Sequence, residues 1–181
     1  MHTEYEVRIL EIDTNVVETR LKELGAEFCW DKIQRRYVYD LIPKVDGKWI
    51  RLRTNGDKTT LTIKNLVSSK IDGTQELEIE VDNFERCHLI LKELGYEPKG
   101  YQENRRRHYV LNGVDIDIDF WPLIPTYLEI EGSSEEAVYK TLEALGFSKE
   151  TATTMDVDGV YKSYGHNLEE IFDLRLEEER R

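Results

Sequence analysis

Cysteine is scarce in this sequence: only Cys29 and Cys87 occur, and they stand far apart. Neither belongs to a CxxC pair, which argues against a structural zinc site and against a disulfide framework. Two isolated thiols suit a reducing compartment, so we expect a cytoplasmic protein. The sequence also lacks an apolar run long enough to span a bilayer, and its first residues lack the hydrophobic segment of a signal peptide.

Positive charge is also in deficit, because 25 Lys and Arg residues face 37 Asp and Glu residues, for a formal net charge of -12. Binding of nucleic acid without sequence preference needs a basic surface, so we expect no nucleic-acid partner, and we expect no membrane partner. A local basic patch can still bind a phosphate. The composition, 39% hydrophobic, predicts one globular domain over 1–166 and a charged C-terminal tail over 167–181, for which a helix is one candidate.

One pattern recurs three times, beginning at Glu4, Glu76 and Tyr127. Each copy has acidic residues at alternate positions of an expected strand, followed by a short amphipathic segment that closes in LxxLG. A glycine at that place is typical of a helix C-terminus. The pattern predicts helices over 14–24, 83–94 and 134–145.

Favoured two-residue turns, Asp46-Gly47, Asn55-Gly56 and Asn112-Gly113, separate most of the remaining β-rich runs. The expected strands cover 3–11, 35–41, 48–54, 58–65, 74–82, 103–111, 114–120 and 126–131. Eight mostly antiparallel strands with few helices predict an α+β fold built on an eight-stranded antiparallel β-barrel.

Alternation along these strands separates a charged face from an apolar face, as in DIDIDF from Asp115 to Phe120. The turns set the register, with Arg106 opposite Asp119 and Arg53 opposite Lys58. Amphipathic helices need an apolar surface, so we expect them on the outside of the barrel and the charged face inside it. An open sheet with one solvated face is the alternative, and for any single strand it is the more ordinary interpretation. Acidic ladders recurring in four strands argue against it, because exposed like charges across strands are unfavourable.

A charged interior restricts what the barrel can hold. Buried charges are costly unless they are paired or coordinate a metal. Clustered carboxylates suit Mg²⁺ or Mn²⁺, and clustered Arg and Lys suit phosphate oxygens. Proteins that bind nucleotides and polyphosphates combine acidic residues, which hold a metal, with basic residues, which bind the phosphates.

Taken together, these segments resemble the CYTH family, also called triphosphate tunnel metalloenzymes, which includes class IV adenylyl cyclases and thiamine triphosphatase-like enzymes. The ExExK signature corresponds to Glu4-Tyr5-Glu6-Val7-Arg8. The later family strands correspond, in order, to RLR, TIK, ELEIEV, RRRHY, DIDIDFWP and YLEIEG, and the resemblance covers about residues 4–164. It implies a tunnel-shaped barrel of eight antiparallel strands.

The resemblance also implies a set of site residues. Those implied to bind substrate are Arg51, Arg53, Lys64, Arg106 and Lys162. Those with an implied catalytic role are Arg8, Lys64 and Arg106. Those implied on the metal side are Glu4, Glu6, Glu78, Glu80, Asp119, Glu129 and Glu131. Two departures stand out: Arg8 replaces the signature lysine, and Arg36 stands where an acid is expected. Because arginine stays protonated, we do not expect Arg8 to act as a base.

Three functions fit these residues. The first is a divalent-metal-dependent phosphohydrolase that acts on ATP, tripolyphosphate or thiamine triphosphate with Mg²⁺ or Mn²⁺. The second is a class IV adenylyl cyclase that releases pyrophosphate, and the third is a binding module without turnover. We favour the first because the sequence shows no clear element for recognising adenine. The oligomeric state stays open, with a homodimer as one candidate.

Overall fold

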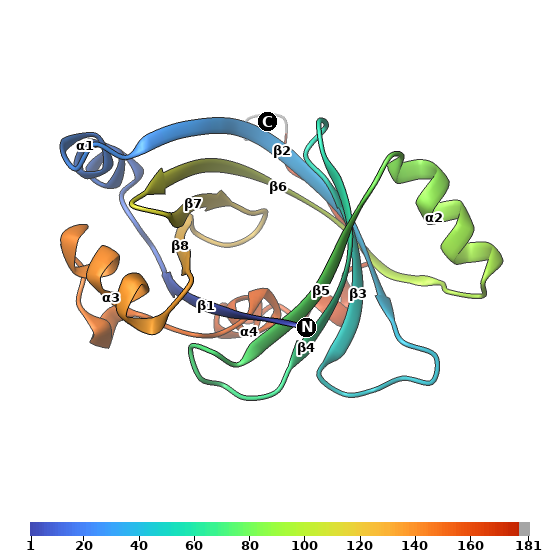
Figure 1. Cartoon of the computed structure of the whole chain (residues 1–181). Helices are drawn as coiled ribbons and strands as arrows, with labels where there is room; N and C mark the ends of the chain where they lie inside the picture. Colours follow the sequence, from blue (N-terminus) through green and yellow to red (C-terminus); the bar gives the residue numbers. More distant parts are fainter. Residues whose placement is uncertain (178–181) are drawn as a thin grey trace.

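A computed structural model of the chain describes residues 1–177 (Figure 1). The strands are β1 (His2–Ile9), β2 (Glu27–Asp40), β3 (Lys48–Thr54), β4 (Thr59–Leu66), β5 (Thr74–Val81), β6 (Pro98–Leu111), β7 (Val114–Phe120), β8 (Tyr127–Gly132) and β9 (Asp173–Leu174). The helices are α1 (Thr14–Glu23), α2 (Phe84–Glu93), α3 (Glu135–Ala144), α4 (Val157–Ser163) and the short 3-10 helices η1 (Lys149–Thr151) and η2 (Leu168–Glu170).

The first eight strands form a closed antiparallel barrel, as predicted. Their order is β2-β3-β4-β5-β1-β8-β7-β6, and pairing of β2 with β6 closes the ring. These two strands are longer than the sequence predicted, beginning at Glu27 and Pro98. On the outside of the barrel, Arg105 and Arg107 of β6 donate hydrogen bonds to Asp31, which lies in the additional part of β2.

The helices pack on the apolar outer face of the barrel, which confirms the predicted arrangement (Figure 1). Helices α1 and α3 cover one side, where Leu21 and Leu142 are fully buried against Ile116 and Ile130. Helix α2 covers the other side, where Leu91 packs in a cluster with Leu52 and Tyr39 of the barrel. The face of the strands that was predicted to be charged is therefore left to face inward.

One predicted turn forms and another is wrong in its register. Arg106 lies opposite Asp119, as the Asn112-Gly113 turn predicted. Arg53 lies opposite Thr60, however, and not opposite Lys58. The side chain of Asn55 accepts hydrogen bonds from the backbone N–H groups of Asp57 and Lys58, which lengthens the turn to four residues. The register shifts by two positions, so every side chain keeps its predicted face.

The segment after α3 contains elements that the sequence did not predict. Helix α4 packs Val160 and Tyr161 against Trp121, and the Tyr161 hydroxyl donates a hydrogen bond to the carbonyl of Pro122. In the predicted tail, η2 forms a single turn and β9 pairs in parallel with β6. Residues 178–181 of the tail lie outside the described part of the chain. Within residues 1–177 no helix has the length and apolar character to cross a bilayer.

The packing of α2 can be tested with two leucines of the same helix. Leu91→Ala should lower the free energy of unfolding by about 2–5 kcal/mol, because Leu91 is 7% exposed and fills space against the barrel. Leu89→Ala, at a side chain 59% exposed, should change it by less than about 0.5 kcal/mol. Urea unfolding of both variants is the measurement. Equal effects would mean that α2 does not pack in this orientation.

Candidate functional site

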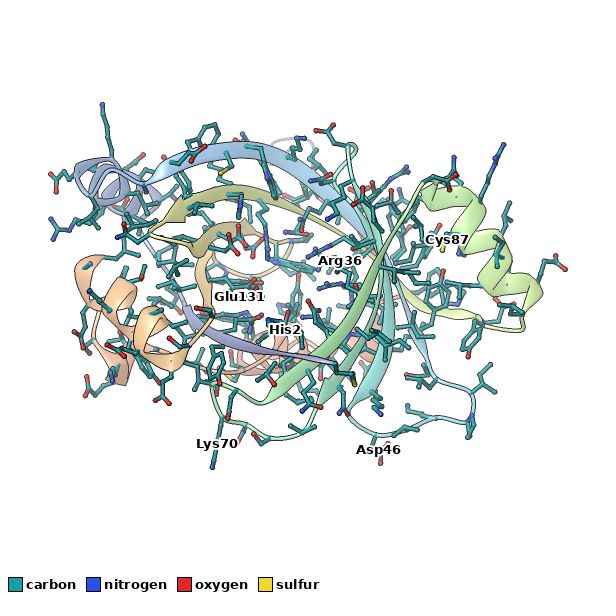
Figure 2. The ribbon with its side chains drawn as sticks, in the orientation of Figure 1. His2, Arg36, Asp46, Lys70, Cys87 and Glu131 are labelled. Atoms are coloured by element: carbon teal, nitrogen blue, oxygen red, sulfur yellow. The ribbon has the colours of Figure 1, made fainter. Side chains whose placement is uncertain are left out.

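The interior of the barrel is hollow and highly charged. A cavity of about 430 Å³ is lined by strands on all sides of the barrel and by residues of α4. A second cavity of about 240 Å³ adjoins it, and both are lined by Arg53, Glu78, Arg106 and Glu131. Figure 2 shows Arg36 and Glu131 inside the barrel, whereas Asp46 and Cys87 lie at its periphery. The two cavities are therefore neighbouring parts of one interior space.

Three carboxylates converge on one wall of the larger cavity. Glu4 and Glu6 stand two residues apart on β1 and so point to the same face, and Glu131 on β8 lies directly opposite Glu6. One oxygen of each lies within 4.8 Å of the others. We call Glu4, Glu6 and Glu131 the acid cluster.

The acid cluster holds its protons unusually tightly. Burial raises the pKa of Glu131 to about 8, and repulsion from Glu4 and Glu6 adds to this effect. Burial also raises the pKa of Glu4 to about 7, although the neighbouring Lys64 acts in the opposite direction. A bound cation would remove the repulsion that favours these protons. Three hard oxygen donors at this spacing fit a divalent ion such as Mg²⁺ or Mn²⁺.

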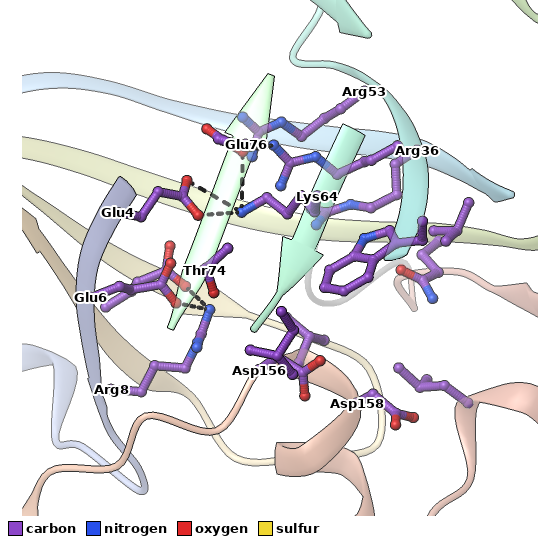
Figure 3. Close-up of a pocket in the computed structure, with 18 of the residues that line it drawn as sticks. Glu4, Glu6, Arg8, Arg36, Arg53, Lys64, Thr74, Glu76, Asp156 and Asp158 are labelled. Atoms are coloured by element: carbon purple, nitrogen blue, oxygen red, sulfur yellow. Dashed lines mark hydrogen bonds and ion pairs between the residues drawn. The ribbon is translucent and has the colours of Figure 1, made fainter. Parts of the chain in front are cut away.

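Cations from three neighbouring strands form the opposite wall, as Figure 3 shows for three of them. This basic wall consists of Arg36 on β2, Arg51 and Arg53 on β3, and Lys64 on β4. Lys64 Nζ lies 2.9 Å from Glu4 Oε2 and 3.3 Å from Glu76 Oε2, and Arg51 lies 3.5 Å from Glu78. Arg53 has no carboxylate within 4.0 Å among residues 1–177. Burial, together with Arg51 and Arg106, lowers its pKa to about 10.

Two further arginines are already neutralised by carboxylates. Arg106 lies 2.5 Å from Asp117, 2.6 Å from Asp119 and 3.0 Å from Glu129. Arg8 lies 2.7 Å from the other oxygen of Glu129, also pairs with Glu6, and donates a hydrogen bond to the carbonyl of Met155. Despite burial, Arg8 and Arg106 hold the pKa of Glu129 well below its usual range. Asp119 and Glu129 are thus turned toward guanidinium groups. In the acid cluster, Glu4 pairs with Lys64 and Glu6 with Arg8, whereas Glu131 has no ion-pair partner among residues 1–177.

The structure leaves three residues of the sequence-predicted set outside the cavities. Asp119 is fully buried and pairs with Arg106, without lining either cavity. Glu80 is on the expected face of β5, but its side chain is 65% exposed and pairs with Lys58. Lys162 on α4 is 58% exposed and pairs with Asp158. Glu78 lines the cavity and accepts a hydrogen bond from Thr62.

The sequence-predicted set also missed residues that line the larger cavity: Arg36, Glu76, Trp121, Asp156 and Asp158. Glu76 and Arg36 could have been found, because alternation places each on the charged face of its strand. The two aspartates come from α4, which lacks a long amphipathic pattern. Trp121 follows the last residue of β7, where alternation no longer applies.

Comparison with known proteins identifies relatives across most of the chain. A protein of Methanocaldococcus jannaschii named "Putative adenylate cyclase" is 26% identical over 160 residues, which cover 81% of this chain and 91% of the relative. A solved structure from Pyrococcus horikoshii superposes with a TM-score of 0.73 at 24% identity, covering 84% of this chain and 96% of that one. A structure from Hippeastrum, described as a "Putative adenylyl cyclase" with a dominant triphosphatase activity, superposes with a TM-score of 0.56 at 18% identity, covering 90% and 96%.

The family comparison covers both walls of the cavity. The CYTH domain model matches residues 2–164, from the start of β1 to the residue after α4. This range includes the acid cluster, the basic wall and all eight strands of the barrel. The chain therefore belongs to the CYTH domain family.

Proposed function

We propose that this protein is a divalent-metal-dependent phosphohydrolase that acts on triphosphates inside the barrel. One observation carries the proposal: the acid cluster and the basic wall face each other across a single cavity of about 430 Å³. A metal–triphosphate complex has the complementary charges, because its cation needs oxygen donors and its phosphates need cationic donors.

On the metal side, Glu4, Glu6 and Glu131 would hold Mg²⁺ or Mn²⁺ through their carboxylate oxygens. Such an ion, when bound, polarises a phosphoryl oxygen and lowers the pKa of a bound water. Glu129 and Asp119 act differently in this proposal. They are held by Arg8 and Arg106, so they fix the positions of these guanidinium groups beside the cavity.

On the phosphate side, Arg51, Arg53 and Lys64 would bind the triphosphate oxygens. Arg53 is the best placed for this role, because its guanidinium has no carboxylate partner among residues 1–177 and can offer two parallel donors. Arg106 contributes positive potential, since its donors are already engaged by three carboxylates. Hydrolysis then requires attack by water on the terminal phosphorus, with cleavage of the P–O bond to the remaining diphosphate. ATP, tripolyphosphate and thiamine triphosphate all carry this reacting group.

A class IV adenylyl cyclase is the second candidate, favoured by the name of the Methanocaldococcus jannaschii relative. In that reaction the same residues would present the α-phosphate to the ribose 3′-hydroxyl, and pyrophosphate would leave. The Hippeastrum protein shares the fold, and its description joins both activities, so the fold does not choose between them. A binding module without turnover would hold the triphosphate and release no product.

A product assay with matched carboxylate variants tests the proposal. With Mg²⁺ or Mn²⁺, the protein should release orthophosphate from tripolyphosphate or ATP, and Glu131→Gln should lower the rate about 100-fold or more by removing a metal ligand. Glu80→Gln, at the exposed end of β5, should keep the rate within about two-fold. Cyclic AMP with pyrophosphate would establish the cyclase instead. Binding of triphosphate without any product would establish the binding module.

The raised pKa values of the acid cluster predict how stability depends on pH. Glu4 and Glu131 have pKa values of about 7 and about 8 in the folded protein, against an ordinary value of 4.5. Between these limits the folded protein binds more protons than the unfolded chain, so the stability of the metal-free protein should fall as pH rises. Glu76, whose pKa is lowered to about 2, does not oppose this trend above its ordinary pKa.

Thermal unfolding from about pH 5 to about pH 8.5, with EDTA or with MgCl₂, is the measurement. The Tm in EDTA should drop by several degrees across this range. Mg²⁺ should raise the Tm most at the alkaline end, where the cluster is ionised. A Tm that rises with pH in EDTA would contradict the assigned protonation.

The basic wall is tested by Arg53→Ala. Calorimetric titration with tripolyphosphate should show an affinity at least about ten-fold lower, because a buried charge-assisted contact to phosphate is lost. Arg35→Ala removes the same group from the next strand, on its outer face, where Arg35 pairs with Glu85. This control should bind as the unchanged protein does. An unaltered affinity in Arg53→Ala would remove β3 from the substrate site.

A further inference from the structure

Arg36 and Arg53 are directly opposed across β2 and β3, and both line the larger cavity. Arg36 is only 5% exposed, and Arg53 is partly buried. Directly opposite residues have Cβ atoms about 5 Å apart, and like charges at that distance repel each other. A buried pair of guanidinium groups is therefore costly unless an anion lies between them.

The neighbours of Arg36 do not neutralise it. Its NH2 group donates hydrogen bonds to Gln34 Oε1, at 3.2 Å, and to Asn104 Oδ1, and both acceptors are neutral amides. Its Nε is buried without a hydrogen-bond partner, and within residues 1–177 no carboxylate lies close enough to form an ion pair. Asp119 accepts a hydrogen bond from Asn104 and is itself neutralised by Arg106. The amides and the Trp121 ring, 4.6 Å from the guanidinium carbon, thus orient the Arg36 group without compensating its charge.

Arg36 stands at one end of a continuous series of cations. The series runs Lys64, Arg51, Arg53, Arg36. Arg51 on β3 pairs with Thr62 on β4, and Lys64 follows Thr62 by two residues. Arg53 follows Arg51 by two residues on β3. Arg36, opposite Arg53, is the fourth member. Arg36 and Arg53 are separated by one strand spacing, Arg53 and Arg51 by two residues along a strand, and Arg51 and Lys64 by the diagonal between two strands, roughly 5–8 Å at the backbone. In Figure 3, Glu4 and Glu6 lie across the cavity from Arg36.

We propose that Arg36, beside Arg53, binds an additional phosphate beyond a triphosphate, so that the tunnel favours linear polyphosphates of four or more units. This inference rests on the proposed function, because it extends the same basic wall. Arg51, Arg53 and Lys64 bind the three phosphates of a triphosphate in the proposed function. Arg36 is the member of the basic wall that has no part in binding them, and it binds the next phosphate. The subsite lies in the larger cavity alone, since Arg36 does not line the smaller one.

The test compares linear tetrapolyphosphate with tripolyphosphate by calorimetry in EDTA, which prevents metal-dependent turnover. The unchanged protein should bind tetrapolyphosphate about ten-fold more tightly. Because the longer chain carries more charge, the deciding quantity is the ratio of the two affinities. Arg36→Gln should abolish this preference and keep the affinity for tripolyphosphate within about two-fold. Arg35→Gln makes the same change on the outer face of the same strand and should retain the full preference.

The outcomes separate the two proposals. Equal affinities of the unchanged protein for tripolyphosphate and tetrapolyphosphate would overturn the proposed subsite. An equal loss of affinity for both in Arg36→Gln would also overturn it. Neither result would contradict the binding of triphosphate by the basic wall. If neither chain binds, the basic wall itself is not the substrate site. Should Arg36→Gln fail to fold, Arg36→Lys keeps the charge but loses the bidentate contact, and it should reduce the preference in part. An unchanged preference in a folded Arg36 variant would also overturn the subsite.

Discussion

Glu129 lies between Arg8 and Arg106, and this buried ion network holds four neighbouring strands of the barrel together from the inside. Arg8 comes from β1, Glu129 from β8, and Arg106 from β6, where it also binds Asp117 and Asp119 of β7. Removing Arg106 would leave the buried Asp119 without its ion-pair partner, which is more costly than never having placed the pair there. The remaining charges of the interior are arranged around this network.

The charged side chains of the interior that lie outside this network form two regions of opposite sign. Acids predominate where β1 meets β8, and guanidinium groups predominate where β2 meets β3. Burial, together with repulsion between like charges in each region, raises the pKa values of Glu4 and Glu131 and lowers the pKa of Arg53. Both regions line one cavity and meet at the ion pair between Lys64 and Glu4, so the proposed metal–triphosphate ligand would complement both.

Alternation and turn chemistry predicted the barrel, the outer helices and the face of nearly every charged residue, because these follow from the two-residue period of a strand. They did not predict how deep a residue lies along the barrel axis. Glu80 and Glu131 belong to similar acidic strands, yet one side chain is 65% exposed and the other joins the acid cluster. The depth of a residue along the barrel axis depends on strand tilt and on where neighbouring strands end, and local sequence predicts neither of these. Helix α4 was missed for a related reason, since seven residues are too few to show a helical period.

The closure of the barrel by β2 and β6 has a consequence for how the protein is made. Glu27 pairs with Val110, so the ring closes through contacts between residues remote in sequence, and proteins rich in such contacts fold slowly. The acid cluster has the same property, because β1 meets its partner β8 only after most of the chain exists. During synthesis the edge of β1 that pairs with β8 therefore stays unpaired even after β5 is made, and Glu4 and Glu6 stay apart from Glu131. An unpaired edge strand is open to association with other chains, so the period before β8 arrives is when the nascent protein is most exposed to aggregation.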